Sequence, residues 1–380
     1  MSDWNQFKGD AHHSGTRLDR EGPRRIERSW TADFVGPVGE PVCDHETVFV
    51  GTAQGNLYAI DATTGSRRWV VETTAATDRA PIVSREMVHF GTDAGKLYAV
   101  DRTSGDRYWT LTLPGPLTAS PTQFEDRLYV GYEGGLAVCV AETGEVIWSY
   151  DTDGSVVGCP AVTDDREWSG PRVYAGTDEE AVFCLEAGDG EEVWRVPTDG
   201  VLAGGPTVAE GRVYVADDAG TLLSLDTDTG QSWFTYKTDG GFSSSVTVRS
   251  GENLAVDEVT TAEEVTEGTT FIGANDGYVH VTDTTFGRRK VRGWLFSKKG
   301  VALDGEIHAS PVVVGNVVCL ADTTGSVYGI DATRYDHWWY EQLEDAVTNT
   351  PAVGQRRLFV PCEDDRLYCL EWDPDEQPGL

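Results

Sequence analysis

Five side chains that can do chemistry stand within three residues of positions where the sequence predicts the start of a β-strand. They are Glu40, Asp78, Arg79, His308 and Asn349. A histidine beside carboxylates can carry out acid–base chemistry, and the five together can hold a small polar ligand or an ion. Alternatively, they line a water-filled channel and pair with one another. The sequence motifs contain no set of nucleophile, base and orienting group, which favours the second interpretation.

A second group of residues combines a dense basic run with acidic segments and a tryptophan. Its members are Trp168, Glu263, Glu264, Arg288, Arg289, Lys290 and Arg292. One interpretation is a surface cluster of ion pairs, each contributing about 0–1 kcal/mol. The other is a docking face for an acidic partner protein, with Trp168 as an aromatic anchor. Both alternatives remain open at this level.

The elements that must position these residues belong to an internal repeat. The segment Val50–Asp61 recurs with few differences as Phe90–Asp101, so that Gly51 and Gly91 lie 40 residues apart. A period of this length is typical of propellers and solenoids. Each unit alternates apolar and polar residues with the period of two that a strand requires.

Eight copies of the central motif are present. Each unit opens with a strand-initiating residue, and these are Pro41, Pro81, Pro121, Pro160, Pro206, Val246, Pro311 and Pro351. Each central motif is followed by a Thr-Gly or similar turn, where an Asp side chain caps the turn and Gly takes the left-handed position. A small-residue position recurs in the third strand of each unit, where Cys139, Cys184 and Cys369 take the place of Ala59.

The fourth strand of each unit carries a tryptophan, but only seven follow the eight central motifs. They are Trp69, Trp109, Trp148, Trp194, Trp233, Trp294 and Trp339. The strand around Trp30 has no unit before it, so we expect it to complete the last blade. Such closure removes exposed sheet edges. The sequence therefore predicts an all-β, eight-bladed propeller of four-stranded antiparallel blades, in which each tryptophan packs between neighbouring sheets.

We expect one domain over residues 1–380. It consists of a lead-in (1–25), the closing strand of blade eight (26–35), the repeats (36–372) and a tail (373–380). Two units carry insertions between their first two strands, at Asp164–Gly170 in unit four and Ser250–Gly268 in unit six. These loops are expected on the same face as the basic run, which follows the third strand of unit six.

The unit pattern of small-Pro, Gly-Thr, Gly-x-Leu-Tyr-Ala, Asp-x-x-Thr-Gly and Trp resembles the pyrroloquinoline-quinone-like (PQQ-like) propeller repeat. The opening Trp4-Asn5-Gln6-Phe7 also looks like the lead-in of that family. The resemblance implies a propeller fold and relatives such as quinoprotein dehydrogenases and the outer-membrane assembly propeller lipoprotein. The sequence lacks the adjacent cysteine pair of the dehydrogenases, and no residue matches their calcium ligands. We therefore predict no cofactor and no enzyme activity.

Composition excludes several function classes. The formal net charge of −33 repels nucleic acid and anionic membranes, and such an acidic, arginine-biased surface is typical of cytosolic proteins in salt-accumulating halophiles. No 18-residue apolar run or signal segment is visible, so we expect a cytoplasmic protein. The seven cysteines show no Cys-x-x-Cys pair, which favours a packing role.

Together these observations predict a non-enzymatic scaffold or adaptor that binds an unidentified protein partner in a high-salt cytosol. It would act as a monomeric propeller or as a subunit of a complex. The alternative is a small-ligand or quinoprotein-like redox protein that uses the mouth of the central channel.

Overall fold

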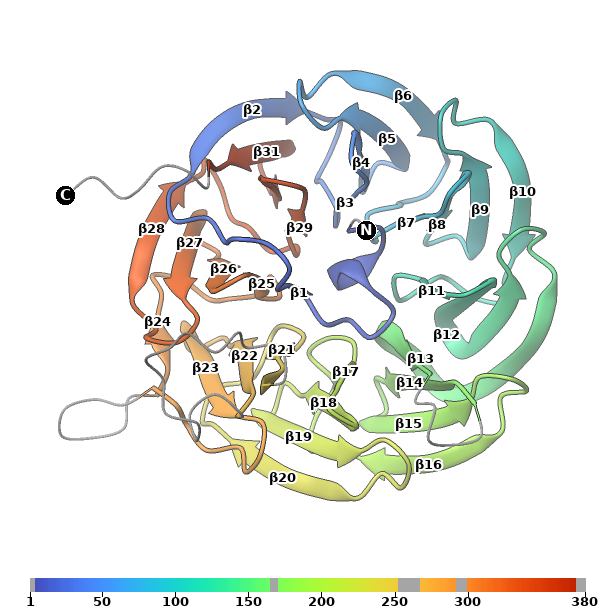
Figure 1. The fold of residues 1–380 in the computed structure, drawn as a ribbon. Helices are drawn as coiled ribbons and strands as arrows, with labels where there is room; N and C mark the ends of the chain where they lie inside the picture. The colour runs from blue at the N-terminus through green and yellow to red at the C-terminus, as the bar shows by residue number, and fades with distance from the viewer. Residues whose placement is uncertain (1–3, 165–169, 252–266, 292–298, 374–380) are drawn as a thin grey trace.

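The computed structural model describes residues 4–164, 170–251, 267–291 and 299–373. Within these residues, the strands form a ring of sheets around one axis (Figure 1). In each sheet the first strand of the unit lies nearest the axis and the fourth forms the outer rim, so the residues before the first strands are carried toward the centre.

Units one to four hold strands β3 to β16. Unit one is β3 (Val42–Cys43), β4 (Thr47–Gly51), β5 (Asn56–Asp61) and β6 (Arg67–Glu72). Unit two is β7 (Ile82–Val83), β8 (Met87–Gly91), β9 (Lys96–Asp101) and β10 (Arg107–Thr112). Units three and four are β11 (Thr122–Phe124), β12 (Arg127–Val140), β13 (Val146–Thr163), β14 (Arg172–Thr177), β15 (Ala181–Glu186) and β16 (Glu192–Pro197).

Units five to eight complete the ring. Unit five is β17 (Thr207–Ala209), β18 (Arg212–Ala216), β19 (Thr221–Asp226) and β20 (Ser232–Lys237). Unit six is β21 (Thr247–Arg249), β22 (Thr269–Gly273), β23 (Tyr278–Asp283) and β24 (Val301–Ala302). Unit seven is β25 (Val312–Val314), β26 (Val317–Ala321), β27 (Ser326–Asp331) and β28 (His337–Gln342), and unit eight is β29 (Ala352–Val353), β30 (Arg357–Cys362) and β31 (Arg366–Glu371).

The prediction of eight blades is wrong, because the described strands form seven sheets. Units three and four share one six-stranded sheet in the order β11-β12-β13-β14-β15-β16. β12 runs on through the position where other units turn, and β13 runs on from the outer rim of unit three to the inner strand of unit four. The eight sequence units are therefore distributed over seven hydrogen-bonded sheets.

A shortened turn in unit three accompanies this difference. In unit one the turn spans Thr52–Asn56 and is closed by a hydrogen bond from Gly55 N to Thr52 O (3.0 Å). In unit three the corresponding turn is one residue shorter, because Val138 rather than Cys139 lies opposite Trp148. Cys139 is thus displaced by one from the predicted small-residue position, whereas Cys184 and Cys369 occupy it opposite Trp194 and Trp30. The chain crosses the shortened turn as extended strand with an irregular register between Glu133 and Gly135.

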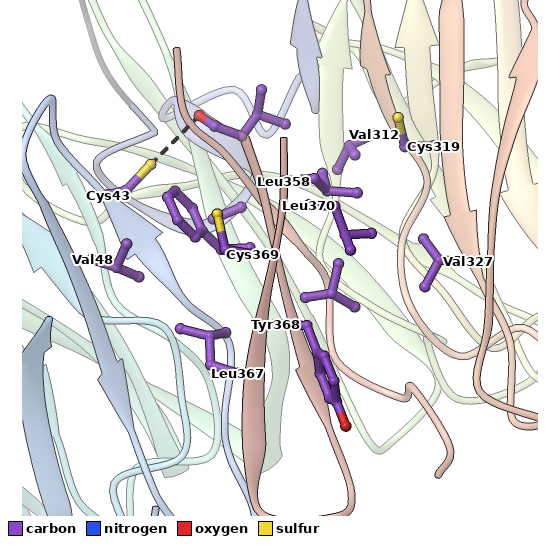
Figure 2. Close-up of a cluster of buried hydrophobic side chains, with 14 of the residues drawn as sticks. Cys43, Val48, Val312, Cys319, Val327, Leu358, Leu367, Tyr368, Cys369 and Leu370 are labelled. Atoms are coloured by element: carbon purple, nitrogen blue, oxygen red, sulfur yellow. Dashed lines mark hydrogen bonds between the residues drawn. The ribbon is translucent and has the colours of Figure 1, made fainter. Parts of the chain in front are cut away.

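The predicted ring closure is present. β2 (Glu27–Asp33) pairs antiparallel with β31, and Trp30 lies opposite Cys369. Buried side chains of units seven, eight and one pack together beside this closing sheet, and Figure 2 shows Cys43, Leu367 and Cys369 among them. The two ends of the chain are therefore joined by both a strand ladder and a shared core.

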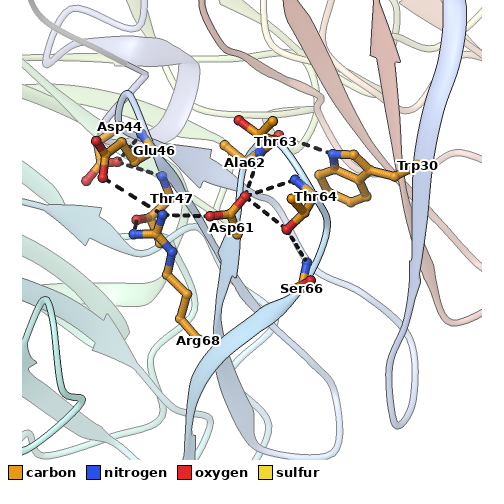
Figure 3. Close-up of polar contacts among 10 residues, drawn as sticks. All are labelled: Trp30, Asp44, Glu46, Thr47, Asp61, Ala62, Thr63, Thr64, Ser66 and Arg68. Atoms are coloured by element: carbon orange, nitrogen blue, oxygen red, sulfur yellow. Dashed lines mark hydrogen bonds and ion pairs between the residues drawn. The ribbon is translucent and has the colours of Figure 1, made fainter.

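A tryptophan and a glycine recur together between neighbouring units. The indole N–H of Trp30 donates to Ala62 O (3.1 Å), directly after the turn-capping Asp61 (Figure 3), and a Cβ added at Gly65 would lie 2.7 Å from the Trp30 ring. The same indole-to-carbonyl bond is made by Trp69, Trp148 and Trp194 to Arg102, Ala187 and Thr227. The recurring Thr-Gly turn therefore needs glycine for two reasons, a positive φ and contact with the neighbouring indole.

Two glycines of one turn offer a matched test of this packing. Gly190 has φ +79° and an added Cβ would lie 2.7 Å from Trp148, whereas an added Cβ at Gly188 meets no atom within 4 Å. Gly190→Ala should lower the free energy of unfolding by about 1–3 kcal/mol, and Gly188→Ala should leave it nearly unchanged. Denaturant unfolding of both variants measures the difference. Equal stability of the two would show that the indole contact is unimportant.

The lead-in fills the axis of the ring from one side. Its 3-10 helix η1 (Phe7–Gly9) lies at the centre in Figure 1, and β1 (Thr16–Arg17) pairs parallel with β25. Lead-in carbonyls accept hydrogen bonds of 2.7–2.9 Å from inner-strand amides of five units, at Cys43, Val83, Val162, Val208 and Val313. The remaining three units are reached through side chains, from Gln6 to Gln123, Lys8 to Val246 and Arg20 to Gly354. The lead-in thus ties all eight units together.

Candidate functional site

The loops that enter the inner strands surround a polar cavity on the axis, here called the axial cup. Its volume is about 230 Å³, every unit contributes to its wall, and Phe7 of the lead-in also lines it. The five residues predicted to converge, Glu40, Asp78, Arg79, His308 and Asn349, all line this cup. The propeller geometry brings them together although they are spread over three hundred residues of sequence.

The residue directly before the strand-initiating proline or valine of each unit belongs to a ring around the axis, and seven of these eight residues line the cup. Three hydroxyls in this ring accept backbone N–H bonds from the preceding ring member: Ala80 N donates to Ser120 Oγ (3.0 Å), Ser245 N to Ser310 Oγ (3.1 Å) and Ser310 N to Thr350 Oγ1 (3.2 Å). These hydroxyls were missed at the sequence level because serine and threonine are also ordinary turn residues. Their recurrence at one position of the repeat is the signal that finds them.

Glu40 is the acidic member of this ring. Ser120 Oγ donates to its Oε2 (3.3 Å), and burial raises its pKa to about 7 against the weaker opposing effects of Ser120 and Arg79. A carboxylate is costly to bury without a counter-ion, and protonation near neutral pH relieves that cost. Glu40 therefore exchanges its proton in the physiological range.

Three of the other four predicted residues make local contacts. Arg79 Nε donates to Leu117 O (3.1 Å), and its guanidinium lies 3.8 Å from Asp93. Asn349 Nδ2 donates to Val38 O (3.0 Å). His308 Nε2 lies 3.2 Å from Glu306. Among the described residues, no hydrogen bond or ion pair joins two of the five side chains directly, so they share a cavity without forming an acid–base dyad.

Buried ionisable groups of the lead-in lie near the cup. Burial lowers the pKa of Lys8 to about 7, while its ammonium donates to Thr207 Oγ1 (3.3 Å) and to Val246 O. Burial also lowers the pKa of His13, whose ring contacts Pro206 O (3.0 Å) and Thr122 Oγ1 (3.2 Å). Both side chains are committed to inner strands, and the cup is closed at the lead-in side.

The predicted partner face is only partly described. Trp168, Glu263, Glu264 and Arg292 lie outside the described residues. Arg289 Nε donates to Tyr236 Oη (2.9 Å), and Lys290 Nζ donates to Thr269 Oγ1 (2.9 Å) and to the carbonyls of Glu267 and Gly268. These two basic groups therefore bind within their own and the neighbouring sheet. Arg288 instead stacks on Phe286, with its Cζ 4.6 Å from the ring centroid.

The structure also corrects the role predicted for Trp233. Phe234, one residue later, lies opposite Ser224 in the inter-sheet position, which leaves Trp233 on the outer side with 56 % of its surface exposed. Arg212 stacks on the Trp233 ring at 4.4 Å and donates to Thr284 O, the carbonyl that an indole would otherwise reach. Because successive side chains of a strand point to opposite faces of the sheet, a shift of one residue moves the tryptophan to the other face.

Comparisons with known proteins identify the family to which this propeller belongs. A family model of PQQ-like repeats, described as outer membrane protein assembly factor BamB, matches residues 14–114, 93–169 and 167–374. The chain belongs to this PQQ-like propeller family. No curated protein matches the sequence.

Solved structures resemble this PQQ-like propeller in fold. BamB from Moraxella catarrhalis is 18 % identical with a TM-score of 0.69, covering 93 % of this chain and 100 % of its own. A europium-containing methanol dehydrogenase is 13 % identical with a TM-score of 0.71, covering 94 % and 89 % respectively. The computationally designed protein Ika8 is 16 % identical with a TM-score of 0.72, covering 91 % and 100 %. At these identities the likeness shows the fold alone.

The family contains proteins with and without enzyme activity, so the chemistry of this PQQ-like propeller must be judged from its own residues. Within the described ranges, no group of three or more His, Cys, Asp or Glu side chains is placed to hold a metal ion. The seven cysteines are free and buried. In the part of the chain that the structure describes, no helix is long and apolar enough to cross a membrane.

Proposed function

We propose that this PQQ-like propeller is a non-enzymatic scaffold that binds another protein at the junction of units five and six, in a high-salt cytosol. The observation that carries the proposal is Trp233, whose ring is 56 % exposed and fixed in place by Arg212. Tryptophan and arginine are the residues most enriched at energetic centres of protein interfaces.

The docking surface, here called the seam, consists of Arg212, Trp233, Phe286 and Arg288. Arg212 bonds to Thr284 O in unit six, so the exposed ring of unit five lies beside the turn that carries Phe286. Phe286 is 60 % exposed, and Gly287 packs on Phe234. Each aromatic ring is thus stacked with a guanidinium before any partner arrives, which reduces the ordering cost of binding.

The charge of the seam indicates the kind of partner. The chain as a whole carries a formal net charge of −33, yet the seam presents two arginines beside two aromatic rings. A partner surface with carboxylates around an apolar centre complements this arrangement. In molar salt this charge complementarity acts only at contact, because charges are screened over about 3 Å.

The test begins with affinity capture in molar KCl and continues with the captured protein in purified form. Trp233→Ala should weaken the purified pair at least tenfold, since removing an interface tryptophan commonly costs about 2 kcal/mol or more. Tyr340→Ala is the matched control, because Tyr340 is 69 % exposed on β28, which belongs to the sheet of unit seven and to neither sheet of the seam. Equal weakening by both substitutions, or by neither, would refute docking at the seam.

The redox alternative has a separate test. A quinone or haem group bound in the axial cup would give an absorption band in protein purified from its host, and a bound metal would appear in elemental analysis. Protein that shows neither and still binds its partner supports the scaffold. A stoichiometric cofactor would contradict the non-enzymatic assignment.

A further inference from the structure

The axial cup holds two carboxylates that have no counter-ion among the described residues. Glu40 and Asp78 both line the cup, and neither takes part in an ion pair in the described ranges. The nearest cations are engaged elsewhere, since Arg79 lies 3.8 Å from Asp93 and Lys8 bonds to inner strands. A carboxylate drawn into a cavity without a paired cation is electrostatically costly, and a cationic ligand would relieve that cost.

Hydroxyl groups surround these carboxylates. Ser120, Ser245, Ser310 and Thr350 line the cup and are each at least 95 % buried. The Ser245 hydroxyl has no hydrogen-bond partner among the described residues. Hydroxyl oxygens accept hydrogen bonds from N–H donors. The cup therefore presents several acceptors around one anionic centre.

The charge and size of the cup restrict its ligand. The strongly negative propeller disfavours anions at any surface depression. A cavity of about 230 Å³ with a floor at Phe7 admits one small polar group rather than a large cofactor. The ligand that fits is positively charged, donates several hydrogen bonds and enters end-on from the open side.

We propose that the axial cup is a binding site for one guanidinium or primary ammonium group. The group is supplied either by a free small amine or by a basic side chain of a partner protein. Glu40 forms the ion pair, while the surrounding serine and threonine hydroxyls accept the remaining N–H bonds. This site is separate from the seam and does not depend on the proposed scaffold function.

Binding should strengthen as pH rises from 6 to 8. Glu40 must be ionised to pair with the cation, and its raised pKa of about 7 places that ionisation in this interval. Lys8 loses its charge over the same range, which acts in the same direction. The other charged or titratable groups around Glu40 are Asp78, Arg79 and the Cys159 thiol, and burial raises the pKa of that thiol.

Calorimetric titration with methylguanidinium and with n-propylammonium tests the site. Tetramethylammonium, which carries the same charge without N–H donors, is the ligand control. We expect the two donor cations to bind with about tenfold higher affinity at pH 8 than at pH 6, and tetramethylammonium to bind at least tenfold more weakly. The peptide Gly-Gly-Arg-Gly-Gly, with Gly-Gly-Gln-Gly-Gly as its control, distinguishes the sources. Tighter binding of the arginine peptide than of the free cations identifies a protein side chain, and equal or tighter binding of the free cations identifies a small amine.

Variants assign the binding to the cup. Glu40→Gln should weaken methylguanidinium binding at least tenfold and reduce its pH dependence to the smaller part that Lys8 contributes, whereas Glu27→Gln, at an exposed carboxylate on β2, should change neither. Ser245→Ala keeps every charge and should weaken binding severalfold, so the proposal stays testable if Glu40→Gln folds poorly. Absence of binding by either donor cation at pH 8, or unchanged binding by both cup variants, would overturn the proposal.

Discussion

Trp4→Ala is expected to lower the free energy of unfolding by about 3–5 kcal/mol, the cost typical of deleting a buried tryptophan. Trp4 is 1 % exposed within the core cluster of units seven, eight and one. Its carbonyl accepts from Cys43 N (2.7 Å), and Arg17 lies 5.1 Å from its ring. Loss of the indole would loosen the lead-in at the point where it first meets the ring.

Denaturant unfolding in a fixed concentration of KCl measures this effect. Trp233→Ala is the matched control, because it removes the same side chain from an exposed position and should change stability by no more than about 0.5 kcal/mol. Similar losses for the two variants would mean that the lead-in contributes little to stability. The same comparison shows that Trp233→Ala is folded, as the binding experiment requires.

Glu40→Gln is expected to stabilise the protein at pH 8 by about 2–3 kcal/mol and to leave it nearly unchanged at pH 4. The folded pKa of Glu40 is raised to about 7 from an ordinary value of 4.5, so the folded state holds a proton that the unfolded state has released. Stability from this proton is fully present below pH 4.5 and is lost as pH rises through 7. Each unit of the shift corresponds to about 1.4 kcal/mol.

The difference in unfolding free energy between the wild-type protein and Glu40→Gln isolates the contribution of Glu40. Lys8 contributes the opposite slope, because its lowered pKa of about 7 makes stability rise with pH between 7 and 10.5. Lys8 is present in both proteins, and its contribution largely cancels in the difference. Unfolding free energies at pH 4, 6 and 8 should show a gap that widens with pH. A gap that stays constant would contradict the assignment of a neutral-range pKa to Glu40.

Much of the fold follows from the repeat alone. The periodic strands, the recurring Thr-Gly turns and the tryptophan count predict the propeller and its closure through Trp30. The number of sheets does not follow, because it depends on β13 continuing from the outer rim of unit three into the inner strand of unit four. The exposure of Trp233 could not be predicted for a similar reason, since a shift of one residue along a strand moves a side chain to the other face.

The role of the lead-in could not be predicted from the sequence for a different reason. Residues 4–20 carry no repeat, and five of the eight units are bound through backbone carbonyls of this segment rather than through recognisable side chains. At the axial cup, the five charged or amide residues were predictable because all stand beside inner strands. The hydroxyl ring and the counter-ion deficit of Glu40 require the three-dimensional arrangement.

The most direct test of the proposed scaffold is cross-linking from the seam. All seven native cysteines are buried, so a single introduced cysteine can be labelled selectively with a benzophenone maleimide. A label at Ser232→Cys, beside Trp233, should cross-link the partner in molar KCl, and the same label at Tyr340→Cys should not. Cross-linking from Tyr340→Cys but not from Ser232→Cys, or equal cross-linking from both, would contradict docking at the seam.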